Sequence, residues 1–276
     1  MTARPERVPA AEVKERMLDA GRELALESGA ALTIEHLRLE EVIQRARVPR
    51  SSVYRLWPYK DDYIDDLLCY IAGPGSWFSN RAVFAPETFT VVTRLLTEHR
   101  QLMATMEGRR ALLREIVRVV VARNYHVLAG NHAWRLHSAL AATLGATRGS
   151  EARKKIAIAL EETQSRTRDL LVELFGYLVE TLGLRLRDPA RTVEHFQMAG
   201  SMLVQGLATR NAQVQAAIGD TQEAAQVDDL LNAPLPGPGL DGEPVQWTLA
   251  AFAYLGVLDA FIELEPDFVP PDGRPR

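Results

Sequence analysis

The chain has 276 residues, of which 32 are Lys or Arg and 36 are Asp or Glu, so the formal net charge at pH 7 is −4. Hydrophobic residues make up 47% and charged residues 25%, which excludes a disordered or collagen-like chain. The single cysteine, Cys69, excludes an intramolecular disulfide framework, and no apolar run reaches the roughly 18 residues of a membrane-spanning helix. No apolar core follows the first basic residues before Pro9, so we expect no signal peptide and a cytoplasmic protein without a membrane partner.

Apolar residues at helical spacing predict an all-α chain. The first helix stops at Gly29, two short helices occupy about residues 39–46 and the segment after Pro49, and a fourth runs from about Lys60 to Ile71. At roughly 100–200 residues per domain, the length has room for two domains.

Longer helices are predicted in the rest of the chain. Asp188-Pro189 predicts the start of a helix that runs to about Arg210, and the last helix covers about residues 247–263. The β-branched stretch Val117–Ala122 lies between helical flanks, so we predict helix there as well. Residues 219–246 are rich in Asp, Gln, Pro and Gly and are predicted to form a long loop.

The most informative window is residues 39–57, where two short helices joined near Arg47 predict a helix-turn-helix. In its second helix, apolar residues share one face, and Arg50, Ser51, Tyr54 and Arg55 share the opposite one. The expected core positions are Leu39, Val42, Ala46, Val48, Val53, Leu56 and Trp57.

Positive charge is concentrated in this window although the chain is acidic. Between Arg45 and Lys60 there are five basic residues and no acidic one. Arginines and small hydroxyls on a helix can bind phosphates and base edges, and an exposed tyrosine can bind a phosphate. The polar face of the second helix therefore predicts a contact with duplex DNA.

The window resembles the N-terminal domain of the TetR family of transcriptional regulators, over about residues 12–72. The matching motifs are Val42-Ile43, Ala46-Arg47-Val48, Val53-Tyr54-Arg55-Leu56-Trp57 and Lys60. The resemblance implies that Arg50 through Tyr54 enter the major groove and that Tyr54 and Lys60 contact phosphates. The candidate DNA-binding residues are Arg47, Arg50, Ser51, Ser52, Tyr54, Arg55 and Lys60.

The sequence departs from the family pattern at three places. Arg47 stands where the family usually has glycine in the turn, and a non-glycine residue with positive φ costs roughly 1 kcal/mol. Ile43 replaces a small residue where the two helices pack, and four extra residues around Thr33 to His36 lengthen the first loop. We expect a slightly opened motif.

The resemblance implies a DNA-binding domain at residues 1–72. It also implies that residues 73–276 form a helical domain that dimerises and binds an inducer. Two stripes of apolar and small residues suit a four-helix dimer interface: Val193, Phe196, Gly200, Leu203, Val204 and Leu207 in one helix, and Leu249, Phe252, Ala253, Gly256, Val257, Ala260 and Phe261 in the last. The alternative is that both stripes belong to the core of one chain.

Four residues close in the sequence mix apolar area with hydrogen-bond donors, as a drug-sized pocket does. The candidate ligand-binding residues are Tyr125, His126, Trp134 and His137. Core packing explains Trp134 equally well. On one helix His126 and His137 would stand ~16 Å apart, too far for one metal ion.

The sequence thus predicts a ligand-responsive, dimeric transcriptional regulator, with a repressor preferred over an activator. We expect it to bind a palindromic operator and to release that operator when a small-molecule effector binds. No spaced set of carboxylates, His or Cys predicts catalysis, a metal site or a cofactor. The alternative is a helical-bundle scaffold or enzyme whose N-terminal helices are purely structural.

Overall fold

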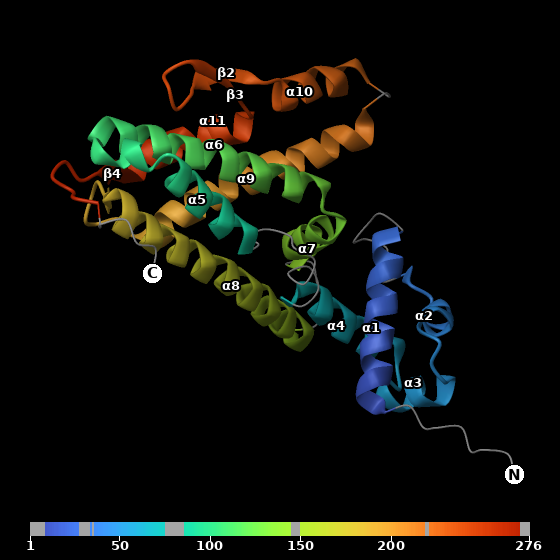
Figure 1. Cartoon of the computed structure of the whole chain (residues 1–276). Helices are drawn as coiled ribbons and strands as arrows, with labels where there is room; N and C mark the ends of the chain where they lie inside the picture. Colours follow the sequence, from blue (N-terminus) through green and yellow to red (C-terminus); the bar gives the residue numbers. More distant parts are fainter. Residues whose placement is uncertain are drawn as a thin grey trace, which may run out of the picture. The chain divides into compact units, whose positions relative to one another are not determined.

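The computed structural model describes residues 9–27, 34, 36–74, 86–144, 150–218 and 221–270, so the expected helix stop at Gly29 and part of the lengthened loop, Thr33 and Glu35, lie outside it. Most described residues are helical (Figure 1), which agrees with the predicted all-α class. The chain divides into two compact units, residues 1–80 with 132–164 and residues 81–131 with 165–276. The functional boundary at residue 72 stays a prediction.

The first unit is built around its N-terminal helix. It contains α1 (Ala10–Glu27), α2 (Leu39–Ala46), α3 (Arg50–Leu56), α4 (Lys60–Ala72), α7 (His132–Thr143) and the first part of α8 (Ser150–Leu182). Helix α1 packs on α2, α3, α4 and α7. The core side chains that are at most 1% exposed include Val13, Met17, Val42, Val53, Tyr63, Leu67 and Ile71.

A buried tyrosine fixes α4 against α1. The Tyr63 hydroxyl donates a hydrogen bond to the Met17 carbonyl oxygen at 3.0 Å, and burial raises the pKa of that hydroxyl. The close approach requires glycine at position 21, because a Cβ there would lie 2.0 Å from Tyr63 Oη. The Trp57 ring meets the Tyr63 ring edge to face, with centroids 5.2 Å apart.

The last carbonyl groups of α4 receive partners from α7 and α8. Thr163 donates its hydroxyl hydrogen to the Ala72 carbonyl oxygen at 2.8 Å. Nδ1 of the buried His137 lies 3.4 Å from the Ile71 carbonyl oxygen. These contacts replace the intrahelical partners that the end of a helix lacks.

The second unit contains the remaining helices and four short strands. The helices are α5 (Pro86–Glu98), the 3₁₀ helix η3 (Arg100–Ala104), α6 (Met106–Gly130), the rest of α8, α9 (Val193–Ala217), α10 (Gln222–Asn232) and α11 (Leu249–Phe261). Helices α6, α9 and α11 pack on one another. The predicted helix at Val117–Ala122 lies within α6 and is confirmed.

Two small antiparallel sheets were not expected. Strand β1 (Leu184–Leu186) pairs with β4 (Ile262–Leu264), and β2 (Leu235–Pro238) forms a hairpin with β3 (Pro244–Trp247). The buried Arg109 donates to the carbonyl oxygens of Leu182 and Glu265, at 2.8 and 2.9 Å. It thereby joins α6 to the end of α8 and to the segment after β4.

The long loop predicted at residues 219–246 is wrong over the described residues 221–246; residues 219 and 220 lie outside the described part of the chain. Helix α10 begins after Thr221, whose side chain accepts a hydrogen bond from the Ala224 amide at 3.1 Å, and the β2–β3 hairpin follows. Buried Ala224 and Leu231 fix α10, which packs on α9. The proline and glycine content reflects the hairpin instead.

The predicted helix start at Asp188-Pro189 is also wrong. The Asp188 carboxylate accepts a hydrogen bond from the Ala190 amide at 2.9 Å, which closes a turn. Helix α9 begins at Val193, and Thr192 caps it, because the His195 amide donates to the Thr192 hydroxyl. It continues to Ala217, beyond the expected end near Arg210.

Candidate functional sites

Helices α2 and α3 are joined by a tight turn at Arg47. This residue is left-handed, with φ 53° and ψ 47°, and its amide donates to the Gln44 carbonyl oxygen. Arg47 therefore has the positive φ that was expected where the family usually has glycine. In the described part of the chain, no other non-glycine residue has a positive φ. Pro49, extended at φ −67° and ψ 129°, then leads into α3.

The two faces of α3 lie as the helical spacing predicted. Val53 and Trp57 are 0% and 3% exposed, whereas Tyr54 is 46% exposed. Arg50, Ser51 and Arg55 are exposed, and Ser52 is partly buried. Lys60 is exposed at the first position of α4. Six of the seven candidate DNA-binding residues, all but Ser52, are thus exposed, and all seven lie within residues 47–60.

One carboxylate on α2 holds two of these side chains. The Tyr54 hydroxyl donates to Glu40 Oε1 at 3.0 Å, and Arg50 forms an ion pair with the same carboxylate. This hydrogen bond, with the negative charge of Glu40, raises the pKa of the Tyr54 hydroxyl. Glu40 lies outside the acid-free window, so the count of charges between Arg45 and Lys60 did not reveal it.

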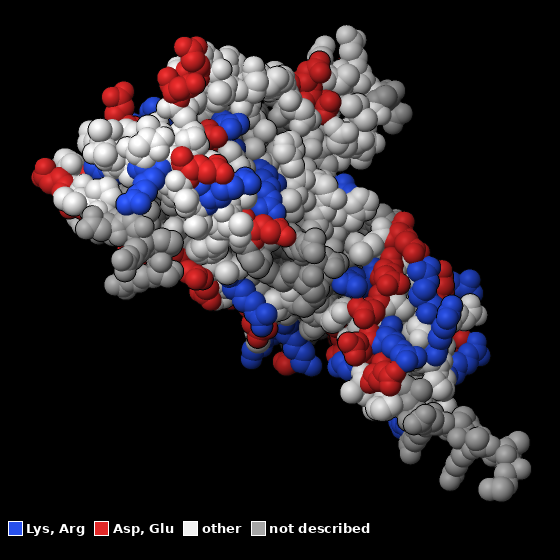
Figure 2. All heavy atoms as spheres, in the orientation of Figure 1, with Lys and Arg blue, Asp and Glu red and all other residues white. Residues whose placement is uncertain are grey.

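A second carboxylate neutralises another of the five basic residues. Arg45 donates to both oxygens of Glu27 on α1, at 2.7 and 2.8 Å, and Glu23 lies 3.8 Å away. This pairing lowers the pKa of Glu27. Within the described residues, Arg47 and Arg55 have no ion-pair partner. Figure 2 shows Lys and Arg gathered over α2 and α3, beside Asp and Glu along α1.

The four candidate ligand-binding residues do not form one site. Tyr125 and His126 belong to the second unit, whereas Trp134 and His137 belong to the first. Tyr125 is buried, with its hydroxyl 3.4 Å from Asn232 Oδ1, and His126 is exposed. Trp134 is 3% exposed, so core packing, the alternative weighed from the sequence, accounts for it.

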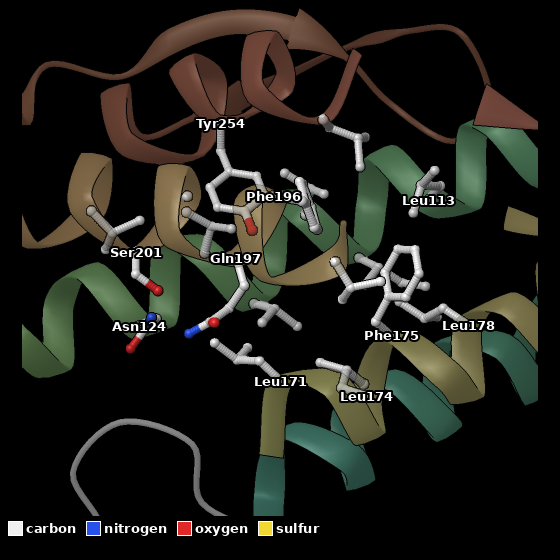
Figure 3. Close-up of a pocket in the computed structure, with 18 of the residues that line it drawn as sticks. Leu113, Asn124, Leu171, Leu174, Phe175, Leu178, Phe196, Gln197, Ser201 and Tyr254 are labelled. Carbon is white, nitrogen blue, oxygen red and sulfur yellow. The ribbon is translucent and has the colours of Figure 1, made fainter. Parts of the chain in front are cut away.

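A cavity of about 100 Å³ lies elsewhere in the second unit, between α6, α8, α9 and α11 (Figure 3). Leu, Ile, Val and Phe side chains line most of it, and none of the lining residues is charged. None of the four candidate ligand-binding residues is among them. Its polar groups come from Asn124, Gln197, Ser201 and Tyr254.

The cavity includes part of the stripe expected at a dimer interface. Val193, Phe196, Gly200 and Val204 line it, so this side of α9 faces the interior of its own unit. A Cβ at Gly200 would lie 2.5 Å from the Tyr254 ring, and glycine therefore allows that ring to pack on α9. The alternative of an intrachain core holds for these four residues.

Comparison with known proteins identifies no relative. No family model matches the chain, and no match is found among curated proteins or solved structures. None of the described helices is long and apolar enough to cross a membrane. In the same part of the chain, no three His, Cys, Asp or Glu side chains lie close enough together to hold a metal ion.

Proposed function

We propose that this protein is a DNA-binding transcriptional regulator of the TetR type, with α2 and α3 as its helix-turn-helix and α3 as the recognition helix. The observation that carries the proposal is the α3 surface. Arg50, Ser51, Tyr54 and Arg55 are exposed, while Val53 and Trp57 anchor the opposite face in the core. This arrangement presents donors to phosphates and base edges on a rigid support.

The first experiment identifies the operator and tests the contact. Selection of bound sequences from a random duplex pool should yield a palindrome, because a dimer presents two recognition helices related by a twofold axis. Substitution of both Arg50→Ala and Tyr54→Ala should then weaken binding to the selected operator by about 100-fold or more. Arg110→Ala, which removes an exposed charge in the other unit, is the matched control.

Salt dependence separates this function from the scaffold or enzyme alternative. Binding should weaken steeply as salt rises, with a slope set by the number of phosphates neutralised. If the double variant binds the operator as the wild type does, or if no duplex is enriched by selection, the proposal is wrong.

The homodimer is proposed to use exposed apolar residues of α9. Met198 and Met202 are 60% and 55% exposed and lie four residues apart, so they share a face of the helix. Exposed Phe252 on α11, 41% exposed, is a further candidate. Sedimentation should show a dimer for the wild type and a monomer for the double variant Met198→Glu and Met202→Glu. Met106→Glu, at a methionine 40% exposed on α6, should leave the dimer intact.

The proposed effector response uses the cavity of the second unit. A ligand that binds one packing of α6, α8, α9 and α11 better than another shifts the population between them, and the operator affinity changes by the same coupling free energy. Release of the operator on ligand binding would make the protein a repressor that is relieved by its effector.

A further inference from the structure

Four arginines of the second unit line one pocket, which is called the arginine pocket below. It has a volume of about 240 Å³, and its lining comes from α6, the end of α11, strands β1 and β4, and the residue that follows β4. Arg110 and Arg114 lie four residues apart on α6, so they share a face of that helix. Arg185 and Arg187 lie two residues apart on β1, so they share a face of that strand. Two elements thus bring four guanidinium groups to the same pocket.

Positive charge exceeds negative charge in the arginine pocket. Two acidic residues, Asp259 and Glu263, line it beside the four arginines, so its net charge is 4 − 2 = +2. Glu263 serves two of the arginines at once: Arg185 donates to one carboxylate oxygen at 2.7 Å, and Arg187 lies 3.6 Å from the other. Such exposed ion pairs are weak, so an anion can compete with Glu263 for both side chains.

The two arginines of α6 have no partner of their own. Within the described residues, neither Arg110 nor Arg114 forms an ion pair or a side-chain hydrogen bond. Arg110 is exposed and Arg114 is half-buried, and no side-chain nitrogen of either is closed to solvent. A guanidinium group is a planar fork of N–H donors that can bind a carboxylate or a phosphate through two parallel hydrogen bonds. Donors are therefore open to an anionic ligand here.

The floor of the arginine pocket is apolar. Leu113, Leu258, Ile262 and Leu264 belong to the lining and are at most 9% exposed, whereas Met106 at the rim is 40% exposed. The volume is larger than the roughly 150 Å³ of an engineered apolar cavity that binds benzene. The exposed lining residues also leave the pocket open to solvent. It therefore has room for a ring-sized apolar group beside an anion.

We propose that the arginine pocket binds a phosphate monoester with a small apolar organic group, with the phosphate on the arginines and the organic group on the apolar floor. A phosphate monoester carries about −1.5 to −2 charges at pH 7, which balances the net charge of +2. A monocarboxylate balances only half of that charge. Each phosphate of duplex DNA carries a single charge within a polymer, so this pocket is not part of the proposed DNA contact. The proposal goes beyond the DNA-binding function and does not rest on it.

The test is titration calorimetry of the full-length protein in a phosphate-free buffer of low ionic strength. Phenyl phosphate should bind about ten-fold more tightly than benzoate, because it carries more charge, and about ten-fold more tightly than inorganic phosphate, because its ring covers the apolar floor. Phenol, which lacks the phosphate, should bind more weakly still. Equal affinity for phenyl phosphate and phenol, or for phenyl phosphate and inorganic phosphate, would overturn the proposal.

Variants of the arginines locate the bound phosphate. Arg114→Gln should weaken the binding of phenyl phosphate about ten-fold or more, and Arg114→Lys should restore only part of it, because an ammonium group lacks the planar fork. Arg94→Gln removes an exposed charge of α5 outside the pocket and should leave the affinity unchanged. If Arg114→Gln does not fold, Arg185→Gln at an exposed position of β1 serves in its place. Wild-type affinity in the folded variant would contradict the proposal.

The two proposals fail separately. The double variant Arg50→Ala and Tyr54→Ala should bind phenyl phosphate as the wild type does, because α3 belongs to the first unit. Loss of binding in this variant, with binding retained in Arg114→Gln, would place the phosphate on α3 and refute the arginine pocket. Binding that depends on Arg114, in a protein that enriches no duplex, would support the pocket and refute only the DNA function.

Discussion

The carboxylate of Glu40 binds two side chains that we propose as DNA contacts, those of Arg50 and Tyr54. Arg50 and Tyr54 must give up this partner when they bind a phosphate or a base, so Glu40 competes with DNA for both. Exposed ion pairs are individually weak, about 0–1 kcal/mol, and their competition changes affinity by a modest factor.

Glu40→Gln should therefore raise the affinity for duplex DNA about two- to five-fold, measured by fluorescence anisotropy at fixed salt. Glu41→Gln, at the adjacent exposed position, removes the same charge without freeing Arg50 or Tyr54 and should have a smaller effect. Equal gains from the two variants would show that only net charge matters, and a loss of affinity from Glu40→Gln would show that the carboxylate positions the side chains instead.

Arg47 stores conformational strain in the turn between α2 and α3, at φ 53°. Glycine has no Cβ and adopts this conformation without the steric cost of about 1 kcal/mol, although it also loses more chain entropy on folding. We expect Arg47→Gly to be more stable than Arg47→Ala by about 0.5–1 kcal/mol in urea denaturation. The alanine variant is the right reference because both lose the guanidinium group. A glycine variant no more stable than the alanine variant would argue against strain.

At the scale of elements, the contact between α1 and α4 depends on the absence of a side chain at position 21. Gly21→Ala should lower the free energy of unfolding by about 1–3 kcal/mol, because the new methyl group displaces Tyr63 Oη from the Met17 carbonyl oxygen. Gly176→Ala in α8 is the matched variant, since no atom lies within 4 Å of a Cβ there. It should raise stability by about 0.5–1 kcal/mol through helix propensity. Destabilisation by both would refute the steric explanation.

Helical spacing was sufficient to predict the elements whose two faces differ. In α3, Val53 and Trp57 are buried and Tyr54 is exposed, as three- and four-residue steps require. The spacing was not sufficient for α10, where Leu231 is buried but the neighbouring Leu230 is 72% exposed. The four prolines that follow α10, at positions 234, 236, 238 and 244, favoured the incorrect prediction of a loop. The three-residue strands β1 and β4 are too short to show an alternating pattern.

The cavity is formed by several elements of the second unit together. No pattern in the sequence predicted it. Its wall runs from Leu113 in α6 to Leu258 in α11, and each apolar residue in it resembles an ordinary core residue. Only the packing of four helices leaves space between them. The predicted cluster around Tyr125 and Trp134 relied on proximity in the sequence, whereas the chain places these residues in different units.

At the same scale, stability should depend on pH through His137. Its burial lowers the pKa of the imidazole below the ordinary value near 6.5, an effect that the contact with the Ile71 carbonyl group only partly opposes. Below about pH 6.5 the unfolded chain binds a proton that the folded chain does not, so the free energy of unfolding falls as the pH falls, by at most ~1.4 kcal/mol per pH unit.

Chemical denaturation of wild type and His137→Gln at pH 8 and pH 5 checks this. The stability of the wild type relative to the variant should be smaller at pH 5, because only the wild type carries the buried imidazole. A relative stability that is the same at both pH values would contradict the prediction.

The β2–β3 hairpin is a two-stranded sheet whose outer edges lack most of their backbone N–H donors. The Gly239 amide donates to the Glu243 carbonyl oxygen, and in an antiparallel pair the inward and outward amides alternate from that point. Positions 236, 238, 244 and 246 then point outward, and three of them are proline. Proline has no N–H group, so a third strand finds almost no donors along either edge. The hairpin therefore resists edge-to-edge aggregation without a covering helix or a flanking charge.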